Sequence, residues 1–108
     1  MAFAKVADVS EVPAGTMKMF VLEETEILVA NVAGKHYAMA GICTHAKGRL
    51  SEGRLEGTTV TCPKHGSKFD VTTGKSLQGP KIAFLKLKTA DEPVYPVKIE
   101  GSSILVDF

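Results

Sequence analysis

The sequence predicts an all-β fold. Short apolar and β-branched segments recur along its 108 residues, and turn residues separate them. No segment keeps the apolar period of an amphipathic helix over the length that a helix needs. The chain also has the length of one domain with a single core. We therefore expect one domain over residues 1–108, with roughly eight to ten short strands.

Four strands are expected in the N-terminal part, at residues 3–9, 17–22, 27–32 and 36–40. The third of them is mostly aliphatic and lies between two turns, which is typical of a buried strand. Residues 33–35, Ala-Gly-Lys, connect the third and fourth strands and predict a hairpin.

The remaining strands follow a turn-rich stretch at residues 50–57. Residues 72–74, Thr-Thr-Gly, predict a second hairpin. Pro96 restricts its strand to a sheet edge or a bulge, because proline donates no backbone hydrogen bond. The segments with strand character in this part are residues 58–61, 68–71, 75–77, 84–88, 94–99 and 104–106.

The composition is that of an ordinary globular protein, with 44% hydrophobic and 23% charged residues. A net charge of +1 and an aromatic content of 6% argue against nucleic-acid binding. The N-terminus lacks the basic start and long apolar run of a signal peptide, and no run is long enough to cross a membrane. We expect a soluble, cytoplasmic monomer.

Two short motifs carry the chemistry. Cys43-Thr44-His45 and Cys62-Pro63-Lys64-His65 contain both cysteines of the chain and two of its three histidines. Thiolate sulfur and imidazole nitrogen suit zinc, copper or iron–sulfur chemistry and not calcium or magnesium. The two motifs therefore predict a metal site with the ligands Cys43, His45, Cys62 and His65.

The order of the ligands favours a [2Fe–2S] cluster over zinc. Structural zinc sites usually pair cysteine with cysteine and histidine with histidine. Here each motif holds one of each, as required when one iron takes two cysteines and the other two histidines. Mononuclear zinc stays open as the alternative. A disulfide between the two cysteines is disfavoured by the neighbouring histidines and a reducing cytosol.

With these motifs the chain resembles the Rieske-type ferredoxins over nearly its whole length. The shared residues are Cys43-Thr44-His45, Leu50-Ser51-Glu52-Gly53, Cys62-Pro63-Lys64-His65-Gly66, Phe69-Asp70, Thr73-Gly74-Lys75 and Gly79-Pro80. The resemblance implies antiparallel sheets with a small cluster-binding subdomain at about residues 41–81. It also implies one Rieske [2Fe–2S] cluster, with Cys43 and Cys62 on the buried iron and His45 and His65 on the outer iron.

The departures indicate the ferredoxin branch. Rieske proteins of cytochrome complexes have a disulfide at the positions of Gly48 and Lys64, a tyrosine at Phe69 and a membrane anchor. The serine that donates to a cluster sulfur is kept as Ser67. Lys47 stands where the ferredoxins often have glycine. Because hydrogen bonds to the sulfurs raise the potential, we expect a value in the lower half of the Rieske range, which is roughly −150 to +300 mV.

Charge is concentrated around the ligands. Residues 43–81 contain seven basic and three acidic residues, a net +4, whereas the rest of the chain carries −3. This concentration of positive charge has two interpretations of equal weight. One is an ordinary solvated loop surface. The other is a docking face for an acidic redox partner, with Lys47, Lys64 and Lys68 as candidates.

Several other side chains have structural interpretations. Leu50, Phe69 and Pro80 are expected to shield the cluster from water. His36 has no cysteine neighbour and is expected at the surface. The methionines Met17, Met19 and Met39 are expected to fill the core.

The function that follows is one-electron transfer from a ferredoxin reductase to a terminal dioxygenase or another oxidoreductase. The protein is expected to be a carrier and not an enzyme, since 108 residues leave no room for an oxygenase's second domain. The alternatives are an accessory subunit of a nitrite reductase-like enzyme, which typically lacks the four ligands, and a zinc-stabilised binding module. A colourless protein would favour zinc.

Reduction of this cluster should be coupled to protonation at alkaline pH. The oxidised cluster with two thiolates and two neutral imidazoles is neutral, and one electron makes it −1. The added charge raises the pKa of the histidine nitrogens that do not bind iron. The potential should therefore fall as the pH rises through the alkaline range, which a redox titration at several pH values measures. A potential independent of pH up to strongly alkaline conditions would contradict this.

Overall fold

The computed structural model describes residues 3–42, 48–64, 66–78, 81–82, 85–86 and 90–108. In this part the chain forms thirteen short strands and two single-turn 3₁₀ helices. All strand pairs are antiparallel. The expected all-β class is thus confirmed, although the number of strands exceeds the expected one. No helix of the described residues is long and apolar enough to cross a membrane.

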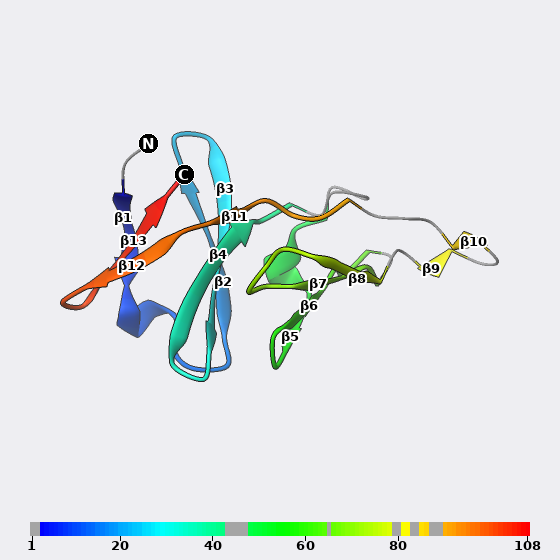
Figure 1. The fold of residues 1–108 in the computed structure, drawn as a ribbon, viewed down its shortest axis with the longest axis horizontal. Helices are drawn as coiled ribbons and strands as arrows, with labels where there is room; N and C mark the ends of the chain where they lie inside the picture. Colours follow the sequence, from blue (N-terminus) through cyan, green and yellow to red (C-terminus); the bar gives the residue numbers. More distant parts are fainter. Residues whose placement is uncertain (1–2, 43–47, 65, 79–80, 83–84, 87–89) are drawn as a thin grey trace.

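The largest sheet has the strand order β11-β4-β3-β2 (Figure 1). Its strands are β2 (Met17–Leu22), β3 (Thr25–Val32), β4 (Lys35–Ala40) and β11 (Val94–Tyr95). The central β3 is buried at five successive positions, as its aliphatic sequence predicts for a strand covered on both faces. Ala33 and Gly34 both have positive φ, so the β3–β4 hairpin turns as predicted.

A second sheet joins the two ends of the chain in the order β1-β13-β12. It consists of β1 (Phe3–Asp8), β12 (Val97–Glu100) and β13 (Ser103–Asp107), and the 3₁₀ turn η1 (Val9–Glu11) follows β1. Its inward side chains pack on the first sheet in one apolar cluster of buried residues: Ala7, Val12, Ile27, Val29, Ala38, Ile104 and Val106. These two sheets form the base of the molecule.

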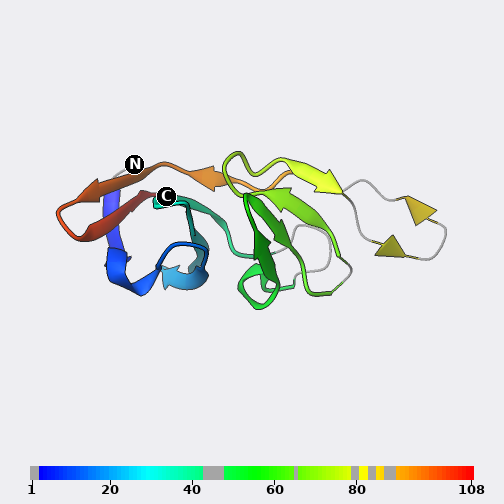
Figure 2. The ribbon, with the colours of Figure 1, turned by 90° about the horizontal axis from the view of Figure 1, so that it is seen from below.

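The third sheet has the order β5-β6-β7-β8 and lies beside the base in both views (Figures 1 and 2). Its strands are β5 (Arg54–Glu56), β6 (Thr59–Thr61), β7 (Lys68–Asp70) and β8 (Ser76–Gln78), preceded by the 3₁₀ turn η2 (Leu50–Glu52). It is the smaller sheet that the resemblance implies for the cluster-binding segment. A short hairpin, β9 (Lys81–Ile82) with β10 (Leu85–Lys86), follows it.

A strap at residues 91–93 ties this small sheet to the base. The Ser76 amide donates to Asp91 Oδ1 at 2.7 Å, and the Glu92 amide donates to the Gly74 carbonyl at 2.7 Å. The Ala40 amide at the end of β4 donates to the Pro93 carbonyl at 2.9 Å. Gly74 has φ +76, and a side chain there would collide with the Glu92 carbonyl, so this approach requires glycine.

Most strands lie where the sequence places them. Of the strand expected at residues 84–88, Leu85–Lys86 is described as β10, whereas residues 84 and 87–88 lie outside the described residues. Its partner β9 was not expected. Two other segments also differ. The stretch at residues 50–57, expected to be a connection, contains η2 and β5. The segment expected as one strand at residues 94–99 is divided at Pro96 into β11 and β12, which belong to different sheets. Both are edge strands, which agrees with the expectation for proline.

His36 is buried, with 9% of its surface exposed, so the expectation of a surface histidine is wrong. Its Nε2 lies 3.1 Å from the buried Val12 carbonyl, to which Asn31 Nδ2 also donates at 2.9 Å. Asn31 Oδ1 in turn accepts from the Gly34 amide at 2.8 Å. The imidazole therefore fastens the segment after β1 to the β3–β4 hairpin.

Replacement of His36 by alanine should lower the free energy of unfolding by about 1–3 kcal/mol, because a buried carbonyl loses a donor and a gap is left in the packing. Lys35→Ala, at the exposed neighbouring position of β4, is the control and should change it by less than about 0.5 kcal/mol. Urea denaturation followed by circular dichroism measures both. Equal stability of the two variants would contradict the role of the imidazole.

Candidate metal centre

The second ligand motif forms the connection between β6 and β7. Strand β6 runs directly into Cys62, whose amide donates to the Ser67 carbonyl at 2.7 Å. The Gly66 amide donates to the Cys62 carbonyl at 3.2 Å, and Gly66 has φ +74. These bonds close residues 62–67 into a tight loop at one end of the small sheet. The loop therefore holds Cys62 by its backbone, and Cys62 is 2% exposed.

Ser67 contributes a buried hydroxyl to the same loop. The residue is fully buried, and its Oγ has no hydrogen-bond partner among the described residues. A buried hydroxyl without an acceptor costs free energy, so such a group needs an explanation. A sulfur acceptor bound at the loop supplies one, because the hydroxyl would donate to it.

The base of the first ligand loop is also fixed. Ile42 and Arg49 form an antiparallel bridge on either side of residues 43–47, and the Leu50 amide donates to the Gly41 carbonyl at 2.9 Å. The Gly41 amide donates to the Glu26 carbonyl at 3.0 Å, which attaches this base to the start of β3. Thus the loop leaves the end of β4 and returns into η2.

The two loops meet at Gly48. A Cβ atom at this position would stand 3.0 Å from Cys62 Sγ and 3.2 Å from Lys64 Cγ. Both distances are tighter than ordinary packing, so glycine lets the end of the first loop approach the second. In the sequence, Gly48 is notable only because it stands where the cytochrome-complex proteins have a disulfide cysteine. Nothing in the sequence indicates its closeness to Cys62 and Lys64.

An apolar cluster lies behind Cys62. Its buried members come from the small sheet and from the base: Leu28, Ala30, Met39, Leu50, Val60, Cys62, Phe69 and Val71. Leu50 and Phe69 are fully buried in this cluster, so they exclude water from this side of the cysteine. Met39 is buried and Met17 packs against this cluster, in agreement with their expected role in the core, and Met19 is partly buried.

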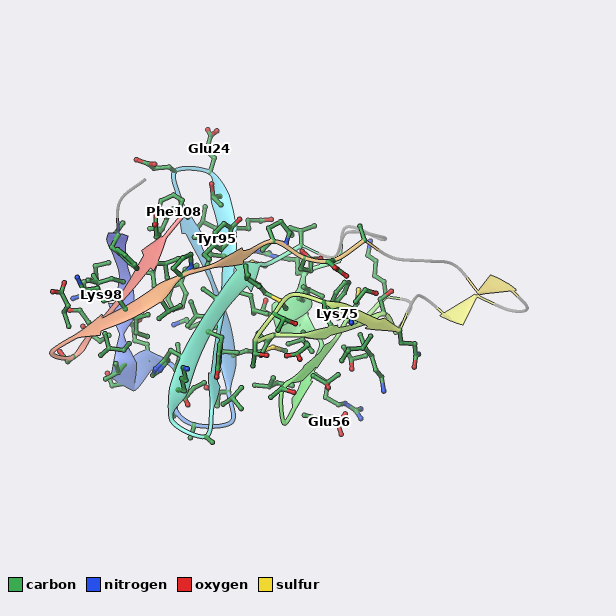
Figure 3. All side chains as sticks on the ribbon, in the orientation of Figure 1. Glu24, Glu56, Lys75, Tyr95, Lys98 and Phe108 are labelled. Carbon is green, nitrogen blue, oxygen red and sulfur yellow. The ribbon has the colours of Figure 1, made fainter. Side chains whose placement is uncertain are left out.

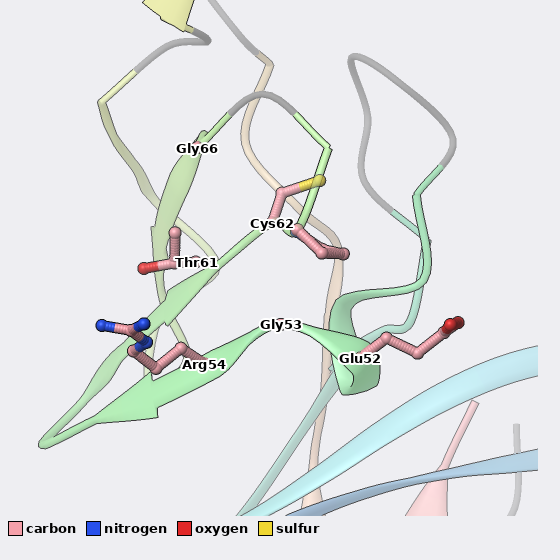
Figure 4. Close-up of a pocket in the computed structure, with 7 residues that line it drawn as sticks. Glu52, Gly53, Arg54, Thr61, Cys62 and Gly66 are labelled. Atoms are coloured by element: carbon pink, nitrogen blue, oxygen red, sulfur yellow. The ribbon is translucent and has the colours of Figure 1, made fainter.

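A pocket of about 370 Å³ opens on the other side of the Cys62 loop (Figure 4). It is lined by Glu52, Gly53, Arg54, Thr61, Cys62, Pro63 and Gly66. A side chain at Gly53 would collide with the Thr61 carbonyl, so glycine allows the chain to pass close to β6. Figure 4 shows the Arg54 and Glu52 side chains pointing away from each other.

Part of the predicted site lies outside the described residues. Cys43, His45, Lys47, His65 and Pro80 belong to that part, so the structure gives no geometry for them. Of the predicted ligands, Cys62 is described. The described docking candidates are Lys64, which is exposed, and Lys68, which is half-buried in β7.

The comparison with protein families decides between a [2Fe–2S] cluster and mononuclear zinc. A profile described as the Rieske [2Fe–2S] domain matches residues 2–90. The chain belongs to the Rieske [2Fe–2S] family. It carries one Rieske-type cluster, and it is an electron-transfer protein and not an enzyme.

The Rieske relatives include ferredoxins of aromatic-ring dioxygenases. The ferredoxin component of the naphthalene 1,2-dioxygenase system of Pseudomonas aeruginosa is 38% identical over 97 residues, which cover 90% of this chain and 86% of the relative. The biphenyl dioxygenase ferredoxin subunit of Pseudomonas sp. (strain KKS102) is 39% identical over 109 residues, covering 100% of this chain and 94% of the relative.

Solved structures show the same Rieske fold. The ferredoxin of carbazole 1,9a-dioxygenase from Nocardioides aromaticivorans IC177 superimposes with a TM-score of 0.83 at 25% identity, covering 98% of this chain and 97% of that chain. A chain in the complex of reduced oxygenase and oxidized ferredoxin in carbazole 1,9a-dioxygenase gives 0.83 at 30% identity, with 96% and 91% covered.

The described residues fit a Rieske cluster. Cys62 offers a buried sulfur at the end of β6, Ser67 offers a donor without an acceptor among the described residues, and Gly48 lets the end of the first loop approach the Cys62 sulfur. When bound, the cluster supplies the site that accepts and releases one electron. The chain itself orients the thiolate, donates a hydrogen bond and excludes water.

Replacement of Ser67 by alanine should lower the reduction potential, because the hydroxyl stabilises the more negative, reduced sulfur. We expect a decrease of roughly 40 mV, which corresponds to ~1 kcal/mol of hydrogen-bond energy for one electron. The control is Ser102→Ala in the exposed turn between β12 and β13. A spectroscopic redox titration measures both, and an unchanged potential in Ser67→Ala would show that the hydroxyl does not face the cluster.

Proposed function

We propose that this chain is the ferredoxin component of a multicomponent oxygenase system. In this role it accepts one electron from a ferredoxin reductase and passes it to a terminal oxygenase. Cys43, His45, Cys62 and His65 hold the cluster, with the cysteines on the inner iron and the histidines on the outer iron. We also propose a cytoplasmic monomer.

The observation that carries the proposal is the burial of Cys62 and of Ser67, whose hydroxyl has no partner among the described residues, in a chain similar to dioxygenase ferredoxins over nearly its whole length. A buried cysteine sulfur and a hydroxyl that can donate to a sulfur are both suited to holding an iron–sulfur cluster. Among the described residues that line the pocket beside the loop, the ionisable side chains Glu52 and Arg54 point apart (Figure 4), so these two do not form an acid–base pair.

The charges of the described residues support docking at the cluster end. Lys64 follows Cys62 by two positions and is exposed, and Arg54 at the rim of the pocket has 76% of its side chain exposed. The nearest acid to Arg54, Glu56, is also largely exposed, at 3.9 Å, and such a pair compensates little of the positive field. An acidic partner would therefore be attracted to this end.

Electron delivery to an oxygenase tests the proposed role. The protein is reduced chemically and mixed anaerobically with the oxygenase of the biphenyl dioxygenase system from Pseudomonas sp. (strain KKS102), whose own ferredoxin serves as the positive control. We expect the visible absorbance that is lost on reduction to return as the oxygenase takes up one electron per chain. If the control reacts and this chain stays reduced, the proposed role is wrong.

The docking face is tested by charge reversal. Lys64→Glu and Lys47→Glu should each slow this electron transfer about tenfold at low salt, and the effect should shrink at physiological ionic strength as charges are screened. Lys98→Glu is the control, because Lys98 lies on β12 at the far end of the base (Figure 3). Stopped-flow absorbance measures the rates. If the rate and its dependence on salt are the same in all three variants, the partner docks elsewhere.

A further inference from the structure

The side chain of Lys64 lies across the point where the two ligand loops meet. A Cβ atom placed on Gly48 would stand 3.2 Å from Lys64 Cγ and 3.5 Å from its Cδ. The methylene groups of Lys64 therefore lie beside Gly48, on the side where a side chain would stand, although the residue as a whole is exposed. Long cationic side chains commonly bury their stems in this way and keep the ammonium group in water.

The same contact includes the cysteine sulfur. Cys62 Sγ would be 3.0 Å from that Cβ atom, so the Lys64 stem and the sulfur lie against the same glycine. Cys62 is 2% exposed, and the apolar cluster protects it from behind.

We propose that Lys64 is a positioning residue with two separable effects on the bound cluster. Its methylene stem holds the end of the first loop, at Gly48, against the second loop and thereby slows loss of the cluster. Its ammonium charge, carried on a stem that lies beside the same glycine as the Cys62 sulfur, favours the reduced state and raises the reduction potential. The proposal rests on the proposed ligand role of Cys62.

Two substitutions separate these effects. Lys64→Met keeps an unbranched apolar stem and removes the charge, whereas Lys64→Ala removes both. The matched control is Lys98→Met, because Lys98 is also an exposed lysine; its ammonium group lies 3.8 Å from the Glu100 carboxylate. It lies at the opposite end of the molecule (Figure 3).

The reduction potential of the cluster measures the effect of the Lys64 charge. Lys64→Met and Lys64→Ala should both have a lower potential than the wild type and Lys98→Met, and the difference should narrow as salt is added. The rate at which the visible absorbance of the cluster is lost in the presence of a chelator measures the effect of the Lys64 methylene stem. The loss should be about fivefold faster in Lys64→Ala, the equivalent of the apolar burial lost with one to two methylene groups, and unchanged in Lys64→Met.

A double-mutant cycle tests the contact itself. Gly48→Ala alone inserts a methyl group against the Lys64 stem and should speed loss of the cluster. In the Lys64→Ala background the contact with the Lys64 stem is relieved and only that with Cys62 Sγ remains, so the same substitution should cost less there than in the wild type. Additive effects would mean that the two residues do not touch.

The outcomes separate this inference from the proposed function. Equal potentials in Lys64→Met and Lys98→Met overturn the effect of the charge, and equal rates of loss in Lys64→Ala and Lys64→Met overturn that of the stem. Both readouts use the isolated protein without a redox partner, so neither depends on where a partner docks. If the wild-type protein binds no cluster at all, the proposed function fails first.

Discussion

The site depends on the packing of Cys62 into the apolar cluster that the small sheet shares with the base. Residues of β3 and β4 and residues of β6 and β7 meet in that cluster, so one contact surface joins the two parts of the molecule and buries the cysteine. A ligand set in a packed interior has little freedom to move, because close packing resists small displacements. The backbone bonds of residues 62–67 then determine where the sulfur lies.

The other side of the site is open to solvent, as transfer of electrons to and from a partner requires. The Cys62 loop carries the exposed Lys64 and borders an open pocket, whereas Leu50 and Phe69 close the rear. Electron transfer needs an approach from outside, but the sulfides need protection from water. The division between an apolar rear and a basic front meets both needs. In the proposed role it also places the charges that attract a partner next to the cluster, where we propose that they change its potential as well.

The sequence was informative where the chemistry is local. The ligand motifs, the turns at residues 33–35 and 72–74 and the burial of β3 follow from residue type and spacing. His36 could not be placed in this way, because its partner Val12 is 24 residues away and belongs to another element. The contact between Gly48 and Lys64 was hidden for the same reason: it joins two loops that the sequence shows only as separate motifs.

Strand β5 shows a different limit. Its three residues, Arg54 to Glu56, have no strand pattern of their own, and pairing with β6 makes them a strand. The strap at residues 91–93 is similar, since its hydrogen bonds go to Gly74, Ser76 and Ala40. Such segments depend on tertiary contacts and not on propensity. They are nevertheless what fixes the small sheet, and hence Cys62, relative to the base.

The most direct test of the account is electron paramagnetic resonance of the dithionite-reduced protein with ¹⁵N-labelled histidine. A cluster held by Cys43, His45, Cys62 and His65 predicts the signal of a reduced [2Fe–2S] cluster with hyperfine coupling to the nitrogens of two histidines. His45→Cys should remove one coupling, whereas labelled His36 should contribute none. A colourless protein with bound zinc, or a [2Fe–2S] signal without nitrogen coupling, would contradict the account.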